Sequence, residues 1–123
     1  MNRFEDPIQF NEKIKIGDIE MIYSNLMEVS QGGPVVGDVL INGKKLQGRF
    51  GGPILHKGYC VYAPIQVMRF LGTGFKLAKI NLNTLVIDHL GKTKFFIYLD
   101  RIERNKIYYF EDIEKTIQKH YEL

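Results

Sequence analysis

Short runs of apolar and β-branched residues alternate with polar residues along most of the chain, and small turn-forming residues separate the runs. The clearest series lies in residues 74–112, where Asn83-Thr84, Gly91-Lys92 and Arg104-Asn105 interrupt the apolar runs. Such a series is typical of consecutive antiparallel strands joined by tight turns. The pattern therefore predicts a mainly β fold, either an antiparallel β-sandwich or one strongly curled sheet.

Two local signals add detail to this prediction. Asn42-Gly43 separates two candidate strands, and a type I′ turn requires positive φ angles at both of its central residues, so a two-residue hairpin is expected there. Residues 59–63 and 95–99 are apolar at successive positions, which favours strands that are covered on both faces. We expect residues 95–99 to form the central strand.

The end of the chain carries a different period. Ile113, Ile117 and Tyr121 recur at every fourth residue, which would place them on one stripe of a helix. Acidic residues come early in this segment, and Lys119 and His120 come late, which is the order that the helix dipole favours. The sequence therefore predicts a C-terminal helix over residues 111–122, packed against the sheets.

The N-terminal part gives weaker signals. Residues 1–12 are mostly polar and contain Pro7, which predicts an N-terminal arm. Residues 18–29 fit either a strand or a helix with one apolar face, and the Gly17-Asp18 turn with its β neighbours favours strand. A length of 123 residues is that of about one domain, so residues 1–123 are expected to form a single domain.

Composition narrows the class of protein. Hydrophobic residues make up 45% of the chain and charged residues 25%, which is typical of a globular domain. Cys60 is the single cysteine, so no intramolecular disulfide can form, and this favours a reducing compartment. The first residues lack the apolar core of a secretory signal, and no apolar run has the length of a membrane helix. We expect a soluble, cytoplasmic protein that does not act at a membrane.

The residues that usually carry catalysis are few and dispersed. Three histidines, at positions 56, 89 and 120, lack the short spacings of a zinc site. Asp88 and His89 are adjacent, but neighbouring residues on a strand point to opposite faces of the sheet. Cys60 lies in an apolar run, where a lone cysteine is usually a small buried hydrophobe. The sequence therefore predicts no catalytic residue, no metal and no cofactor, and favours a protein that acts by binding.

Candidate binding residues are those expected at loops, because loops on a rigid sheet carry recognition more often than strand interiors do. We expect a protein partner to contact two segments. The first surrounds the glycine-rich tip at residues 72–74, and the second is the charged turn at residues 101–104. Their residues are Arg69, Phe70, Thr73 and Lys76 in the first segment, and Arg101, Glu103 and Arg104 in the second.

Three stretches of the last two-thirds of the chain also suggest a family. Residues 51–65 (GGPILHKGYCVYAPI), 74–85 (GFKLAKINLNTL) and 105–112 (NKIYYFED) together resemble the small β-rich immunity proteins of bacterial polymorphic-toxin and contact-dependent growth inhibition systems. The resemblance implies a compact cytosolic protein without a cofactor, which binds a cognate toxin domain and blocks its active site. Immunity proteins against nuclease toxins are commonly acidic, whereas this chain has a net charge of +3.

The sequence is also consistent with two other functions. The chain could be a small ligand-binding β-barrel or sandwich, or an enzyme whose site is assembled from separate strands, and either would need a concave apolar pocket. A nucleic-acid-binding β module is a weaker alternative. It would use Arg69, Lys76 and Lys79 beside Phe70 and Phe75, although the basic residues of the whole chain are scattered among acidic ones.

Overall fold

The computed structural model describes residues 5–69 and 72–123, and this part of the chain consists of β-strands and turns without an α-helix. The prediction of a mainly β fold is confirmed. Within the same residues, there is no helix with the length and apolar character needed to cross a lipid bilayer. The strands in chain order are β1 (Lys13–Ile16), β2 (Ile19–Glu28), β3 (Val35–Ile41), β4 (Lys44–Lys45), β5 (Leu55–Lys57), β6 (Cys60–Arg69), β7 (Gly72–Asn81), β8 (Ile87–Lys94), β9 (Tyr98–Glu103), β10 (Lys106–Phe110) and β11 (Gln118–Glu122).

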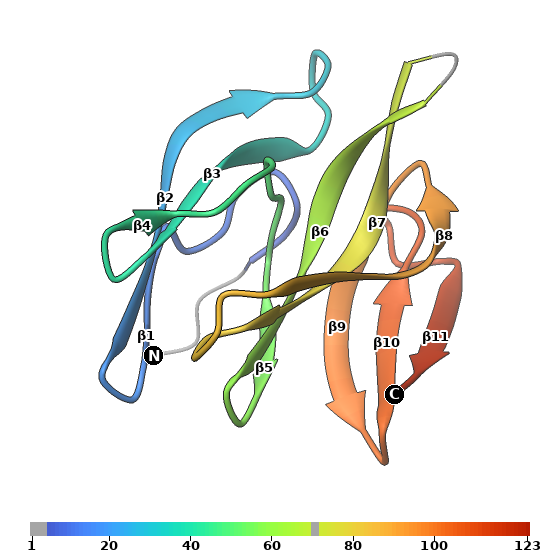
Figure 1. Ribbon diagram of the computed structural model, residues 1–123. Helices are drawn as coiled ribbons and strands as arrows, with labels where there is room; N and C mark the ends of the chain where they lie inside the picture. Colours follow the sequence, from blue (N-terminus) through green and yellow to red (C-terminus); the bar gives the residue numbers. More distant parts are fainter. Residues whose placement is uncertain (1–4, 70–71) are drawn as a thin grey trace.

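The strands form three antiparallel sheets, and none of them closes into a barrel. Sheet A has the order β1-β2-β3-β4, sheet B the order β5-β6-β7-β8, and sheet C the order β11-β10-β9. Sheet B lies between the other two sheets (Figure 1). The expected sandwich or single curled sheet is therefore replaced by three sheets, with the chain completing one before it begins the next.

Local turn chemistry explains several strand boundaries. Asn42 and Gly43 have φ angles of 48° and 84°, and they join β3 to β4 as the predicted two-residue hairpin. Residues 19–28 form strand β2, which settles the choice between strand and helix in favour of strand. Asn25 interrupts this strand at a φ of 52°, where the pairing with β3 shifts register. At this bulge the Asn25 carbonyl accepts a hydrogen bond from Arg49, which lies in the segment after β4.

Sheet B contributes to two separate hydrophobic cores. The side chains of Val61, Ala63 and Ile65 pack toward sheet A, whereas Tyr62 between them packs toward sheet C. Because successive side chains of a strand point to opposite faces, a strand between two sheets must be apolar at consecutive positions. This confirms the predicted strand with two covered faces at Val61, Tyr62 and Ala63. The prediction is wrong at Tyr59, which lies in the turn before β6 and is 63% exposed.

Phe50 joins sheets A and B through its backbone. Its N–H and C=O groups exchange hydrogen bonds of 2.8 and 2.9 Å with Gly37 of β3, and a bridge on its other side connects it to Ile65 of β6. Its side chain is fully buried in the core between the two sheets. Pro64 sits beside this bridge, where its carbonyl accepts a hydrogen bond from Gly51. The strand continues through Pro64 because a single bridge, and not a full ladder, lies on that side.

Residues 5–12 form an arm that contacts both outer sheets. Pro7 is buried, and its carbonyl accepts a hydrogen bond of 2.9 Å from Val35 at the start of β3. The carbonyl of Glu5 accepts one of 2.9 Å from the hydroxyl of Tyr98 in β9. Phe10 packs edge-to-face on Tyr23 of β2, with ring centroids 5.0 Å apart. The arm therefore belongs to the packed structure.

The predicted helix over residues 111–122 is wrong. Residues 118–122 form β11, which pairs with β10, and residues 111–117 form the turn between them. The Asp112 carboxylate accepts hydrogen bonds of 3.0 and 2.9 Å from the backbone N–H groups of Thr116 and Ile117. Lys115 has a φ of 62°, which an α-helix does not permit. The four-residue spacing therefore does not mark a helix. Ile113 and Ile117 lie in the turn, and Tyr121 lies in β11.

The prediction for residues 95–99 is also wrong. The central strand of sheet C is β10, and β9 lies at its edge. Ile97 and Leu99 are buried, but Phe95 precedes the strand in a connection and is 78% exposed. An apolar run predicts burial only where two layers meet, and here the run starts beyond the edge of the core.

Asp38 is a nearly buried carboxylate in β3, with 7% of its surface exposed. Asn25 donates a hydrogen bond of 2.9 Å to its Oδ2 atom, while Arg49 and Lys45 lie 3.4 and 3.8 Å from its oxygens. The hydrogen bond from Asn25, with the two cations, lowers the pKa of Asp38 below its ordinary value although burial opposes this. Arg49 also donates a hydrogen bond of 2.5 Å to the carbonyl of Asn25, so the cluster holds the β2 bulge in place.

We expect Phe50→Ala to lower the free energy of unfolding by about 3–5 kcal/mol, because it leaves a cavity in the core that sheets A and B share. Urea denaturation followed by circular dichroism measures the change. Phe95→Ala serves as the matched control, since Phe95 is mostly exposed, and it should change the stability by no more than about 0.5 kcal/mol. Equal losses in both variants would contradict the role assigned to Phe50.

We expect Asp38→Asn to lower the melting temperature at pH 7 and to have a smaller effect at acid pH. The folded-state pKa of Asp38 is lowered. The stability that its charge contributes is therefore present above the unfolded-state pKa, near 3.9, and is lost as the pH falls through the lower folded-state value. Thermal unfolding of both proteins between pH 7 and pH 3 tests this, because all other carboxylates are common to the pair. A difference in melting temperature that does not shrink below about pH 4 would rule it out.

Candidate functional site

The residues that the sequence predicted as partner contacts lie at opposite ends of the molecule. Arg69 pairs with Gly72, and Thr73 pairs with Met68, at the far end of the β6–β7 hairpin. Phe70 lies outside the described residues. The β9–β10 turn, which carries the second predicted group, lies at the other end (Figure 1). The two groups therefore do not form one continuous surface, and contact of a partner with either group stays a prediction.

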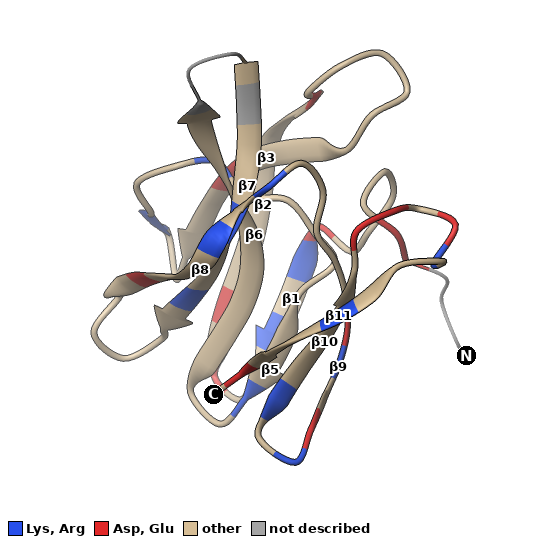
Figure 2. Cartoon of the chain, turned by 90° about the vertical axis from the view of Figure 1, so that its right-hand side faces the viewer, with Lys and Arg blue, Asp and Glu red and all other residues tan. Residues whose placement is uncertain are grey.

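The β9–β10 hairpin carries a row of side chains on the outer face of sheet C. Figure 2 shows its basic and acidic positions next to one another near the turn. The Arg101 guanidinium lies 4.1 Å from the centre of the Tyr108 ring, 2.6 Å from Asp100 and 3.7 Å from Glu103. The hydrogen bond to Asp100 is the main cause of the raised pKa of Arg101. The charge of Arg101 is thus balanced within the chain, and Glu103 and Arg104 are exposed beside it.

The basic residues proposed for nucleic-acid binding do not form one patch. Lys76 pairs with Ile65, whose side chain belongs to the core between sheets A and B. Lys79 pairs with Tyr62, which belongs to the core between sheets B and C. Because paired residues lie on the same face of a sheet, the two lysines point to opposite faces of sheet B.

A different surface gathers exposed apolar side chains, and we call it the Phe95 surface. Phe95 is 78% exposed, Ile117 is 47% exposed and Ile8 is 43% exposed. They come from the β8–β9 connection, the β10–β11 turn and the N-terminal arm. Phe96 and Ile113 line two hollows next to these exposed side chains. The Phe95 surface comprises Ile8, Phe95, Phe96, Ile113 and Ile117.

Two open hollows follow one another along this surface. The first, of about 330 Å³, is lined by Phe95, Phe96 and Ile117 together with Lys94 and Glu111. The second, of about 290 Å³, is lined by Phe96, Ile8 and Ile113 together with residues 32–34 of the β2–β3 connection. Phe96 forms part of both walls, so the two hollows are neighbours on one continuous surface.

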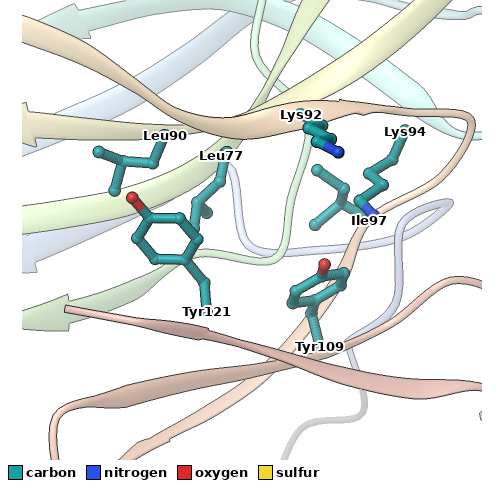
Figure 3. A pocket seen from close by; sticks show the side chains of 8 residues that line it. Leu77, Leu90, Lys92, Lys94, Ile97, Tyr109 and Tyr121 are labelled. Atoms are coloured by element: carbon teal, nitrogen blue, oxygen red, sulfur yellow. The ribbon is translucent and has the colours of Figure 1, made fainter.

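A third hollow adjoins them between sheets B and C, and we call it the Lys94 cleft. Its volume is about 140 Å³. Figure 3 shows the side chains of Lys92 and Lys94 on one side and the hydroxyl-bearing ends of Tyr109 and Tyr121 on the other. The lining residues are Leu77, Leu90, Gly91, Lys92, Lys94, Ile97, Tyr109 and Tyr121.

Gly91 and Tyr121 line the Lys94 cleft where β8 and β11 approach each other. A Cβ atom on Gly91 would lie 3.4 Å from the Tyr121 ring, and Gly91 has a φ of 74°. Glycine therefore suits this position for both its backbone conformation and the approach of the ring.

The electrostatics of the cleft are dominated by lysine. The Nζ atom of Lys94 lies 3.2 Å from an Oε2 atom of Glu111, and this interaction is the largest cause of the raised pKa of Lys94. Burial raises the pKa of the Tyr109 hydroxyl, so Tyr109 is a neutral hydrogen-bonding group at physiological pH. Lys119 pairs with Tyr109 across β11 and β10 and therefore lies on the same face of sheet C. Lys92 and Lys94 are the charged residues that line the cleft, and Glu111 is the ion-pair partner of Lys94.

The sequence did not identify either of these sites. Phe95 lies in an apolar run that was expected to be buried, and Ile117 was assigned to the stripe of a helix. The signals that could have indicated the true structure are local. Asp112 precedes Thr116 and Ile117, and an aspartate side chain readily holds such a turn through hydrogen bonds.

The described part of the chain contains no cluster of metal-ligating side chains. In residues 5–69 and 72–123, no three side chains of histidine, cysteine, aspartate or glutamate come close enough to hold an ion. His56, His89 and His120 are exposed, and the ring of His120 lies 5.8 Å from that of Tyr108. Cys60 is partly buried against the core between sheets B and C. The Phe95 surface and the Lys94 cleft are therefore the candidate binding sites.

Comparisons with known proteins add no family to this description. Comparison of the chain with protein-family models, with curated proteins and with solved structures gave no match.

Proposed function

We propose that this chain is a non-catalytic binding protein that docks a protein partner on the Phe95 surface. The observation that carries the proposal is the exposure of Phe95, at 78%, within a group of apolar side chains from three separate segments. Grouped exposed apolar residues with a polar rim are typical of protein-binding sites. Aromatic side chains are also enriched among the residues that dominate binding energy.

The shape of the surface favours a protein over a small ligand. Pockets that enclose small ligands have volumes of about 300–1,000 Å³ and bury most of the ligand. The Lys94 cleft has a volume of about 140 Å³, and the two hollows of the Phe95 surface are open depressions beside exposed side chains. A partner surface that covers several shallow depressions at once would bury Phe95 and its neighbours together.

The proposed partner is a bacterial toxin domain, following the resemblance of residues 51–65, 74–85 and 105–112 to immunity proteins. The chain has a net charge of +3, and lysines surround the cleft next to the Phe95 surface. Electrostatic complementarity then favours an acidic face on the partner. Binding there would inhibit the toxin by covering its active site or the surface through which it reaches its substrate.

We expect Phe95→Asp to abolish partner binding while leaving the melting temperature within about 2 °C of the wild type, because Phe95 is mostly exposed. The measurement is affinity capture from the lysate of the source organism with tagged protein, followed by titration of the recovered partner. Tyr59→Asp is the matched control, since Tyr59 is 63% exposed in the β5–β6 turn away from the Phe95 surface. Equal partner binding by wild type and Phe95→Asp would refute the site.

The toxin assignment has its own test. Expression of the captured partner alone should stop bacterial growth, and co-expression with this chain should restore it. Co-expression with Phe95→Asp should fail to restore growth, whereas Tyr59→Asp should restore it fully. A partner that does not impair growth would overturn the toxin assignment and would leave the protein-binding role standing.

A further inference from the structure

We propose that the Lys94 cleft seats an apolar side chain of the partner that lies next to a carboxylate. This inference rests on the proposed function, because it names the chemistry of the segment that a protein partner would insert beside the Phe95 surface. The cleft has an apolar floor and a basic rim, and neither property alone would specify the occupant.

The floor sets the size of the apolar group. Leu77, Leu90 and Ile97 line the cleft from β7, β8 and the connection that leads into β9. A volume of about 140 Å³ is close to the ~150 Å³ of a protein cavity that holds one benzene molecule. One phenylalanine or leucine side chain therefore matches the volume of the cleft.

The rim sets the charge. Lys92 is exposed at the mouth, and no carboxylate within the described chain forms an ion pair with it. Lys94 shares the mouth and is paired with Glu111, while Lys119 lies on the neighbouring edge strand. With Lys92 and Lys94 in the lining and only Lys94 paired with a carboxylate of the described chain, the opening is net positive, so a carboxylate is attracted and an ammonium group is repelled. The Tyr109 and Tyr121 hydroxyls can donate hydrogen bonds to the same carboxylate (Figure 3).

Glu111 would compete with the partner's carboxylate for Lys94. Its oxygen lies 3.2 Å from the Nζ atom of Lys94, in the wall that the cleft shares with the Phe95 surface. An incoming carboxylate must either share Lys94 with Glu111 or displace it. Glu111→Gln removes the negative charge and keeps the shape of the side chain, so it should strengthen binding of an anion in the cleft.

The first test uses benzoate and its neutral isostere benzamide as probes of the protein alone, followed by nuclear magnetic resonance. Benzoate should shift the resonances of Leu77, Leu90, Tyr109 and Tyr121 saturably and should bind at least about fivefold more tightly than benzamide, a preference that added salt should reduce. Lys94→Gln should remove most of this preference, and Glu111→Gln should increase it. Lys44→Gln, on β4 in sheet A, is the matched control and should leave it unchanged. Equal binding of the two probes, or shifts outside the cleft, would overturn the inference.

The second test asks whether the occupant is a protein segment. A displayed peptide library selected on the wild type should enrich an aspartate or glutamate beside a phenylalanine or leucine, and selection on a Lys92→Gln, Lys94→Gln double variant should not. If Phe95→Asp abolishes partner binding while the double variant binds normally, the proposed function stands and the cleft assignment fails. If benzoate binds in the cleft but neither a peptide nor a protein partner is found, the assignment to a protein segment fails.

Discussion

The pairing of Phe50 with β3 on one side and β6 on the other is the constraint on which the rest of the structure depends. Its two hydrogen bonds to Gly37 fix the distance between sheets A and B, and its buried ring fills the space that this distance creates. Gly37 must be glycine, because a Cβ atom there would lie 2.7 Å from the Leu26 side chain and from the Ser24 carbonyl in the β2 bulge. The Asp38 cluster stabilises that bulge, so a polar network outside the core maintains the geometry of the core.

The position of sheet B explains why a cleft exists. One face of sheet B is committed to sheet A, so sheet C packs on the other face through Tyr62, Leu77 and Ile107. Sheet C has three strands and sheet B has four, and the edge strand β11 approaches β8 at Gly91. Beside that contact, Leu77, Leu90 and Ile97 of the second core line an open hollow. The Lys94 cleft is therefore the uncovered margin of the second core.

The sequence predicted the features that depend on neighbouring residues. Asn42-Gly43 determined its own hairpin, and the apolar run at residues 59–63 indicated a strand between two layers. The features that the sequence did not predict depend on residues far apart in the chain. The bridge from Phe50 to Ile65 has no local signal, because RFGGP has the composition of a loop. Phe95 is as apolar as Leu99, and only the edge of sheet C decides that one is exposed and the other buried. The stripe of Ile113, Ile117 and Tyr121 fitted a helix, but hydrogen bonds to Asp112 favoured a turn.

The same local hydrogen bonds order the β10–β11 turn, which carries Ile113 and Ile117 of the Phe95 surface. Glu111 donates its N–H to the Ile117 carbonyl at 2.9 Å, and Asp112 holds the two N–H groups that precede β11. Ile113 and Ile117 are therefore presented by a turn that is already ordered before a partner arrives. Ordering a loop on association costs binding free energy, and a turn fixed in advance avoids most of that cost. A surface of shallow depressions can then support specific binding, because the loss of conformational entropy that usually weakens such surfaces has largely occurred on folding.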